Sequence, residues 1–395
     1  MPWEAMSKLD LRREFVMLAR REGANIRQLC RGFSIAPKTG YKWIARFRDA
    51  GENGLGDKSR RPLSSPRRSS ADVEGATLAV RQAHPAWGGR KIRRVLEREG
   101  IETPAASTIT AILRRNGQPV GTFGGGHPAW TRFEHAAPND LWQMDFKGHV
   151  GLVDGGRLHP LTVLDDHSRY AIVLRACVDQ KTQTVREALV DAFRRYGLPR
   201  ALITDNGSPW GDGPGSPFTP LGVFLIDQGV RIAHSRPYHP QTMGKDERFH
   251  RSLKAEALAG RPFNTLEEAA RALERWRHVY NHQRPHEALD LATPADRYQP
   301  SPREYRETPE PFDYAPGDYL RKVQHGGWLT LRGRNKRVPK AFKGKHVALP
   351  PNDRDGVFEV YYRSQCIAVL DFTDENGQTQ PVTYVSEQVS PISPV

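Results

Sequence analysis

The sequence predicts a multidomain α+β protein, with a basic helical N-terminal region, a central α/β domain and a small β-rich C-terminal domain. Three observations support this. The length of 395 residues is enough for roughly two to four domains. Apolar residues recur at helical spacing through the first third, and strand and helix patterns alternate in the middle. Short alternating segments with Gly and Asn turns fill the last part.

The charge balance favours a polyanionic partner. The net charge is +14 and the pI about 9.8, and residues 1–70 hold 16 Lys and Arg against 7 Asp and Glu. Basic side chains displace counterions from phosphates, so nucleic acid is favoured, with an anionic membrane surface as the rival. We find no apolar run of the roughly 18–20 residues that a spanning helix needs, and the first residues do not show the apolar h-region that is typical of a signal peptide. Three widely spaced cysteines fit a reducing cytoplasm.

Residues 1–60 are predicted to form a helix-turn-helix domain. Helical spacing marks residues 9–22 and 25–32, and a third helix is expected to begin at Pro37 after a short turn. Two short helices joined by a tight turn are typical of this motif. The alternative is a basic three-helix bundle without groove contacts. The side chains that the last helix would present to a DNA groove are Lys38, Thr39, Lys42 and Arg46.

The next segments repeat this theme. The stretch "GLGDKSRRPLSSPRRSS" (residues 54–70) combines Gly, Pro and Ser with basic residues. We therefore expect residues 61–71 to form a linker that follows a phosphate backbone together with Arg60 and Arg61. Residues 72–118 include "WGGRKIRRVLEREG" and predict a second helix-turn-helix-like domain. Residues 119–134 include "GTFGGGHPAW" and predict another linker.

Residues 135–300 predict the central domain. The segments "NDLWQMDFKGHV", "LHPLTVLDD" and "YAIVLRACV" indicate an antiparallel meander. An amphipathic helix, the strand "RALIT", a helix near 217–228, the strand "VRIAHS" and a helix opening near Met243 follow. This order is that of a ribonuclease-H-like α/β domain, in which the first and fourth strands are neighbours. Residues 265–283 predict an amphipathic helix that closes the domain.

Three carboxylates converge in that layout. Asp145 interrupts the first strand, where a charge is costly unless it is paired or bound to metal. Asp205 directly follows "RALIT", so the topology places it beside Asp145, and Glu247 on the later helix could reach the same point. Phosphodiester cleavage requires an activated oxygen and relief of charge on the leaving oxygen. Two Mg²⁺ ions about 3.5–4 Å apart can provide both, and Mg²⁺ prefers oxygen ligands.

The stretches "WQMDFKGH", "LDDHSRY", "ITDNGSPW", "HPQTMGKDERFHRSLKAE" and "YNHQRPHEAL" resemble the integrase core of DDE transposases from bacterial insertion sequences, the retroviral-integrase type. "LCRGFSIAPKTGYKWIARF" and "GLGDKSRRP" resemble the DNA-binding region of that family. The resemblance implies a catalytic, metal-binding triad of Asp145, Asp205 and Glu247 with two Mg²⁺ ions, for which Mn²⁺ can substitute. It also implies a nucleoid-associated bacterial protein that binds double-stranded DNA, both element ends and target, as a homo-oligomer.

Some residues leave alternatives. Asp246 adjoins Glu247 but points about 100° away on a helix, and the "GKDER" match favours Glu247. Asp165 and Asp166 are expected to be turn residues, and Trp210 either stacks on a base or packs a loop. Two departures from the family are Met243, where Asn is usual, and the Gly/Pro-rich insertion "WGDGPGSPF".

Arg251 and Lys254 share a helical face with Glu247. We expect them to contact phosphates, although an ordinary solvated face is the alternative. His167 and His239 are expected to make structural hydrogen bonds.

The C-terminal part is predicted to be a Pro-rich linker, residues 301–316, and a small SH3-like β-barrel, residues 317–385. The first half of this barrel is strongly basic, so DNA contact and protein contact are both open.

The sequence therefore predicts a transposase that binds terminal inverted repeats and catalyses metal-dependent DNA cleavage and strand transfer. The alternatives are a DNA-binding regulator with an inactive core, or a simple nuclease of the same fold.

Overall fold

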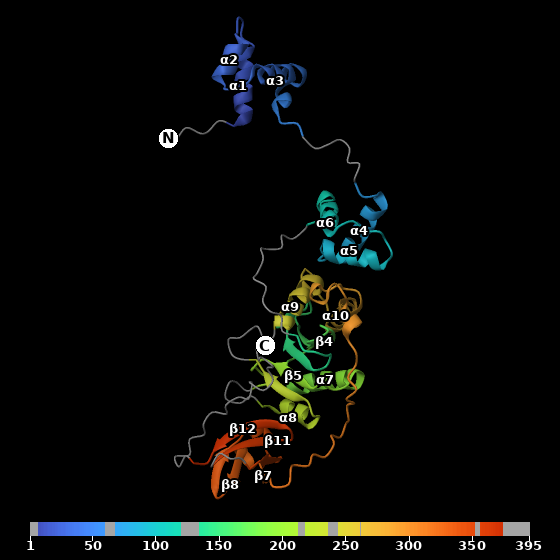
Figure 1. The fold of residues 1–395 in the computed structure, drawn as a ribbon, viewed down its shortest axis with the longest axis vertical. Helices are drawn as coiled ribbons and strands as arrows, with labels where there is room; N and C mark the ends of the chain where they lie inside the picture. Colours follow the sequence, from blue (N-terminus) through green and yellow to red (C-terminus); the bar gives the residue numbers. More distant parts are fainter. Residues whose placement is uncertain are drawn as a thin grey trace. The chain divides into compact units, whose positions relative to one another are not determined.

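The computed structural model describes residues 7–59, 68–119, 134–211, 218–235, 244–260, 262–351 and 356–373 (Figure 1). The chain divides into two compact units, Met1–Arg68 and Ser69–Val395. Arg60, Arg61, His239, Met243 and most of the "WGDGPGSPF" insertion lie outside the described residues. Within the described ranges, every helix is too short or too polar to cross a membrane.

The N-terminal unit is built from helices α1 (Lys8–Ala19), α2 (Ile26–Gly32) and α3 (Pro37–Ala50), followed by the 3₁₀ turn η1 (Gly51–Leu55). The third helix begins at Pro37, as predicted. A Cβ atom at Gly40 would lie 2.5 Å from Cys30 Sγ, so glycine allows α3 to cross α2 closely. The helix-turn-helix prediction is confirmed. The buried core consists of Phe15, Val16, Cys30, Trp43 and Leu55.

A second helical group begins the larger unit. It contains α4 (Ala71–Ala83), α5 (Gly89–Arg98) and α6 (Ala106–Arg115), packed around Trp87, Ile92 and Ile109 among others. A Cβ atom at Gly89 would lie 2.4 Å from the carbonyl oxygen of Ala106, which again places a glycine where two helices meet closely. These helices lie in the region, residues 72–118, that the sequence predicts to be a second helix-turn-helix-like domain.

A six-stranded sheet forms the centre of the larger unit. Its strands are β1 (Leu141–Phe146), β2 (Val150–Gly151), β3 (Arg157–Asp165), β4 (Ala171–Cys177), β5 (Ala201–Thr204) and β6 (Arg231–His234). β3 pairs antiparallel with β1 and β4, and the short strand β2 pairs antiparallel with the first residues of β3. β1 pairs parallel with β5, and β5 with β6. The resulting path β4-β3-β1-β5-β6 confirms the predicted meander and the predicted neighbours.

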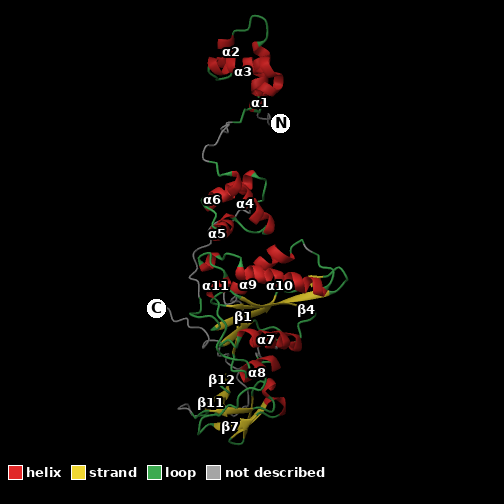
Figure 2. Cartoon of the chain, turned by 90° about the vertical axis from the view of Figure 1, so that its right-hand side faces the viewer, coloured by secondary structure: helices red, strands yellow, loops and turns green. Residues whose placement is uncertain are grey.

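Helices cover both faces of this sheet (Figure 2). One face packs on α7 (Thr182–Tyr196) and α8 (Pro220–Asp227) through a core that includes Trp142 and Phe193. The other packs on α9 (Gly244–Leu253), its π-helical extension η3 (Lys254–Leu258) and α10 (Leu266–His282) through Phe249 and Trp276. The short elements η4 (Glu287–Leu289) and α11 (Pro294–Arg297) follow.

The C-terminal strands lie where the sequence predicts them. They are β7 (Tyr319–Lys322), β8 (Trp328–Leu331), β9 (Arg334–Arg337), β10 (His346–Leu349), β11 (Val357–Tyr362) and β12 (Gln365–Asp371), with the 3₁₀ turns η5 (His325–Gly327) and η6 (Lys340–Phe342). Among the described residues they form a sheet of order β12-β11-β10-β7 and a separate β8-β9 hairpin. These pairings leave the closed SH3-like barrel a prediction.

Two sets of contacts attach the C-terminal strands to the core. Phe342 packs its ring edge on Phe218 with centroids 5.3 Å apart, and Lys345 pairs with Asp227 at 2.9 Å. The first part of the predicted linker is also hydrogen-bonded to the core. Ser301 N–H donates to the carbonyl of Tyr196 at 2.8 Å, so this segment follows the core surface.

Candidate active site

Asp145 and Asp205 lie at the ends of two adjacent parallel strands. The β1–β5 register pairs Trp142 with Leu202 and Gln143 with Ile203. Asp145 lies two residues beyond Gln143 on β1, and Asp205 lies two residues beyond Ile203, directly after β5 ends, so this register brings the two residues to neighbouring positions. Burial raises the pKa of Asp145 to about 6, and the charges of Asp205 and Glu247 add to this rise. The hydrogen bond from the Phe146 N–H and the charge of Lys147 lower the pKa and offset part of the rise. The Asp145 carboxylate therefore lies within electrostatic reach of both Asp205 and Glu247.

The turn after β5 holds Asp205 in place. Its Oδ1 accepts a hydrogen bond from Gly207 N–H at 2.9 Å, and its carbonyl accepts one from the His234 ring at 2.9 Å. Asn206 Nδ2 donates to the carbonyl of Ser235 at 2.8 Å, which ties the turn to the end of β6. Asp205 is exposed, so it combines the common role of a turn carboxylate with access to solvent beside Asp145.

The first turn of α9 presents two adjacent acids differently. Glu247 is exposed, whereas Asp246 is 1% exposed. An Asp246 carboxylate oxygen lies 3.2 Å from the Thr162 hydroxyl, and the other lies 3.2 Å from His250 Nε2. Burial raises the pKa of Asp246 well above its usual range and lowers the pKa of His250 to about 3. The Thr162 hydroxyl also lies 2.9 Å from the carbonyl oxygen of Asp145.

Within the described ranges, Asp145, Asp246 and His250 have possible metal-ligand atoms within 4.8 Å of one another. This group shares only Asp145 with the predicted triad. His250 and Asp246 already contact each other and Thr162, which fits a buried polar network as well as a metal site. The metal-binding roles of Asp205 and Glu247 therefore remain predictions.

Sequence reasoning missed Thr162 and His250. The available signals are a hydroxyl within the apolar run "PLTVL", and a histidine one helical turn after Asp246.

Asp165 and Asp166 stand at the β3–β4 turn, as predicted, but both are buried. Asp165 accepts hydrogen bonds from the N–H and hydroxyl of Ser168 at 2.8 and 2.6 Å. Asp166 instead binds Gln143 Nε2 at 2.8 Å and Lys245 Nζ at 2.5 Å. The second carboxylate therefore connects the turn to β1 and α9.

Trp210 follows the Asp205 turn and is 2% exposed. Its ring stacks on Phe146 with centroids 5.4 Å apart, so it packs the domain rather than facing a base. Arg251 and Lys254 are both exposed. Lys254 lies in the π-helical extension, so the predicted α-helical spacing from Glu247 ends at Leu253.

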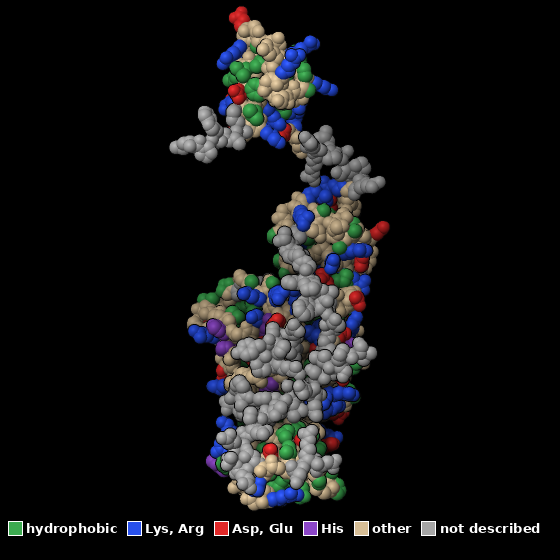
Figure 3. Space-filling view, turned by 60° about the vertical axis from the view of Figure 1, so that its left-hand side comes forward, with side chains coloured by type: hydrophobic (Ala, Val, Ile, Leu, Met, Phe, Trp, Pro, Cys, Tyr) green, Lys and Arg blue, Asp and Glu red, His purple; other side chains and the backbone are tan. Residues whose placement is uncertain are grey.

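The predicted groove-contacting residues lie on α3. Lys38 and Lys42 are exposed, and Thr39 and Arg46 are half-buried. Lys42 Nζ lies 4.4 Å from the Trp43 ring centroid and the Arg46 guanidinium 5.0 Å from it, so one buried aromatic ring orients both cations. Figure 3 shows Lys and Arg side chains projecting from this helical unit.

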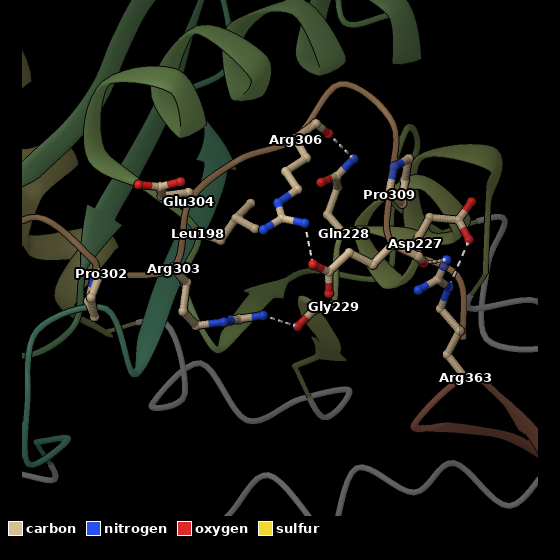
Figure 4. Close-up of a pocket in the computed structure, with 11 residues that line it drawn as sticks. Leu198, Asp227, Gln228, Gly229, Pro302, Arg303, Glu304, Arg306, Pro309 and Arg363 are labelled. Carbon is tan, nitrogen blue, oxygen red and sulfur yellow. Dashed lines mark hydrogen bonds and ion pairs between the residues drawn. The ribbon is translucent and has the colours of Figure 1, made fainter. Parts of the chain in front are cut away.

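A cavity of about 380 Å³ lies where residues 302–310 cross the core, and it is lined by Leu198, Asp227 and Gln228 among others. Its arginines already have partners (Figure 4). Arg303 donates to the carbonyl of Gly229 at 2.7 Å, and Arg363 pairs with Asp227 at 3.4 Å. The cavity does not include the carboxylates near Asp145, and its contacts serve packing between segments.

Family models match most of the chain. Two models described as integrase core domain match residues 135–240 and 228–294, and the C-terminal domain of IS481 family transposases matches residues 318–378. A homeodomain-like model matches residues 39–113, and a helix-turn-helix model matches residues 11–62. The helical matches support DNA binding.

Known proteins agree with these matches. The chain is 29% identical over 234 residues to an uncharacterized 31.7 kDa protein of insertion element IS407 from Burkholderia multivorans, covering 57% of this chain and 82% of that protein. It is 31% identical over 160 residues to an uncharacterized 39.2 kDa protein of IS476 from Xanthomonas euvesicatoria, covering 40% and 44%. The HTLV-2 integrase catalytic core, solved in complex with magnesium, aligns with a TM-score of 0.31 at 16% identity, covering 41% of this chain and 97% of that one.

The family models and the insertion-element relatives identify the class: the chain belongs to the bacterial insertion-sequence transposases with an integrase core.

Proposed function

We propose that this protein binds the terminal inverted repeats of its element, cleaves a phosphodiester there and joins the freed 3′-hydroxyl to target DNA. The proposal is supported by the parallel pairing of β1 with β5, which brings Asp145 and the residue directly after β5, Asp205, to neighbouring positions. The charges of Asp205 and Glu247 also contribute to the raised pKa of Asp145. Asp145 is partly buried and has two exposed carboxylates near it, and this arrangement of like charges is unfavourable unless a cation compensates it.

The donor set fits a hard divalent cation. Asp145, Asp205 and Glu247 offer only oxygen ligands, which Mg²⁺ and its substitute Mn²⁺ prefer, and we assign two ions to them. When bound, such ions stabilise charge on the attacking and leaving oxygens. The chain itself supplies the positions: β1 and β5 fix Asp145 and Asp205, and the Gly207 N–H orients Asp205. Exposed Arg251 and Lys254 would contact phosphates near the site.

The remaining parts would bind DNA and bring two ends together. Helix α3 would face a DNA groove with Lys38, Thr39, Lys42 and Arg46. Arg60 and Arg61 would contact the phosphate backbone of the DNA. Because two element ends must be joined, we propose a homo-oligomer when DNA is bound. The basic C-terminal strands would close into the predicted barrel, and the protein would act on nucleoid DNA in a bacterial cytoplasm.

A strand-transfer reaction tests this function. Wild-type protein is incubated with labelled DNA bearing the ends of its own element, supercoiled target and Mg²⁺, beside Asp205→Asn and Asp154→Asn. Asp154 is a matched control, because it is exposed and its Oδ1 accepts the Gly156 N–H at 2.9 Å, as Asp205 does with Gly207.

Joined product from wild type and Asp154→Asn, but not from Asp205→Asn, is expected. End binding without cleavage in both Mg²⁺ and Mn²⁺ would favour the regulator. Cleavage without joining would favour the simple nuclease.

A further inference from the structure

The first turn of α9, which carries Glu247, is fastened to the sheet by buried polar groups. Lys245 Nζ lies 2.5 Å from Asp166 Oδ2, and their side chains are 17% and 2% exposed. Asp166 directly follows β3. This ion pair therefore joins the beginning of the helix to the end of a central strand.

Gln143 makes a second link between the same elements. It lies on β1 two residues before Asp145 and is 2% exposed. Its Nε2 donates to Asp166 Oδ1 at 2.8 Å, and its Oε1 accepts from the Asp246 N–H at 3.3 Å. One amide thus connects Asp166 to the backbone of the residue that precedes Glu247.

We infer that Asp166 is a positioning residue, which acts through Lys245 and Gln143 to set the Glu247 carboxylate against Asp145. This inference rests on the proposed function, because it takes Glu247 as a metal ligand. Replacing a residue that orients a metal ligand without binding the metal itself typically weakens metal affinity by about 10–100-fold. A buried ion pair that merely stabilised the fold would change thermal stability without changing metal affinity.

The experiment measures Mn²⁺ affinity by calorimetry and the thermal midpoint in parallel, on the full chain. The variants are Asp166→Asn, Lys245→Gln and the double variant Asp166→Asn/Lys245→Met, which removes both charges. The control is Arg284→Gln, because Arg284 and Glu256 form an equally buried ion pair at 2.9 Å beyond the other end of α9, with side chains 8% and 9% exposed.

We expect about 10–100-fold weaker Mn²⁺ binding in both single variants and in the double variant. The double variant should recover the thermal midpoint, because no buried charge is left unpaired. The control should lower the midpoint and leave Mn²⁺ affinity unchanged.

Wild-type Mn²⁺ affinity in the double variant, together with lost binding in Glu247→Gln, would overturn the positioning role and leave the proposed function standing. Absence of Mn²⁺ binding by wild type would overturn both. If Asp166→Asn alone fails to fold, the double variant and Lys245→Gln still decide between these outcomes.

Discussion

Asp246 and Glu247 are consecutive on α9 and lie in opposite environments: Asp246 is 1% exposed against Thr162 and His250, and Glu247 is exposed. An α-helix turns about 100° per residue, so one acid can face the sheet while the next faces solvent. This difference in exposure is why we propose Glu247, and not Asp246, as the metal ligand.

Glu247→Gln is expected to reduce strand transfer by at least about 100-fold with little change in stability, because an exposed carboxylate is lost at the metal site. Asp246→Asn is expected to keep activity within about tenfold, because an amide can still bond Thr162 and His250. Joined product is quantified for both variants beside wild type. The reverse pattern would show that Asp246 is the ligand.

The sequence predicted the framework of this site well. The order of strands and helices matches a ribonuclease-H-like layout, in which the first and fourth strands are neighbours, and the observed pairing of β1 with β5 confirms that neighbourhood. It did not reveal that Asp166 reaches Lys245 and Gln143, because such contacts join residues far apart in the chain and depend on side-chain orientation. An Asp in a turn motif predicts a turn whether or not its carboxylate continues into the core.

The same limit applies to Trp210 and Lys254. A tryptophan in a loop fits base stacking and packing equally well until its burial is known. The π-helical segment at Lys254 carries no pattern in the sequence that distinguishes it from the α-helix before it.

Replacing Trp210 should destabilise the domain. Trp210→Ala removes a 2% exposed ring stacked on Phe146, and we expect a loss of about 3–5 kcal/mol in the free energy of unfolding. Trp328 is the control: it is 38% exposed with the Arg337 guanidinium 4.4 Å from its ring centroid, so Trp328→Ala should cost under about 1 kcal/mol. Urea titrations of both variants measure these changes. Equal losses would contradict the packing role.

His286 should make the fold sensitive to acid. Burial, and then the charge of Arg284, holds the pKa of His286 well below its usual range. Below about pH 6.5 the unfolded chain binds a proton at this residue that the folded chain does not, so the free energy of unfolding falls as pH falls. His286→Gln should lessen that slope by up to about 1.4 kcal/mol per pH unit between about pH 6 and 5. Denaturant titrations across this range, with exposed His325→Gln as the control, measure the difference. An unchanged slope in His286→Gln would show that His286 is not the responsible group.

Lys38 should contribute charge to DNA binding. Lys38→Ala is expected to weaken binding to element ends and to reduce the slope of log affinity against log salt by about 1, because one phosphate contact is lost. Lys8→Ala is the control, since Lys8 is also exposed but lies on α1. Fluorescence titrations at several salt concentrations give both slopes. Identical slopes for the two variants would argue against the assigned role of α3.

Asp145, Asp205 and Glu247 are proposed to hold the catalytic metal. The most direct measurement is anomalous diffraction from crystals of the full chain soaked in Mn²⁺. We expect a Mn²⁺ peak within about 2.5 Å of carboxylate oxygens of both Asp145 and Asp205, on the side of Glu247. A peak coordinated instead by Asp145, Asp246 and His250, or the absence of any peak beside Asp205, would contradict it.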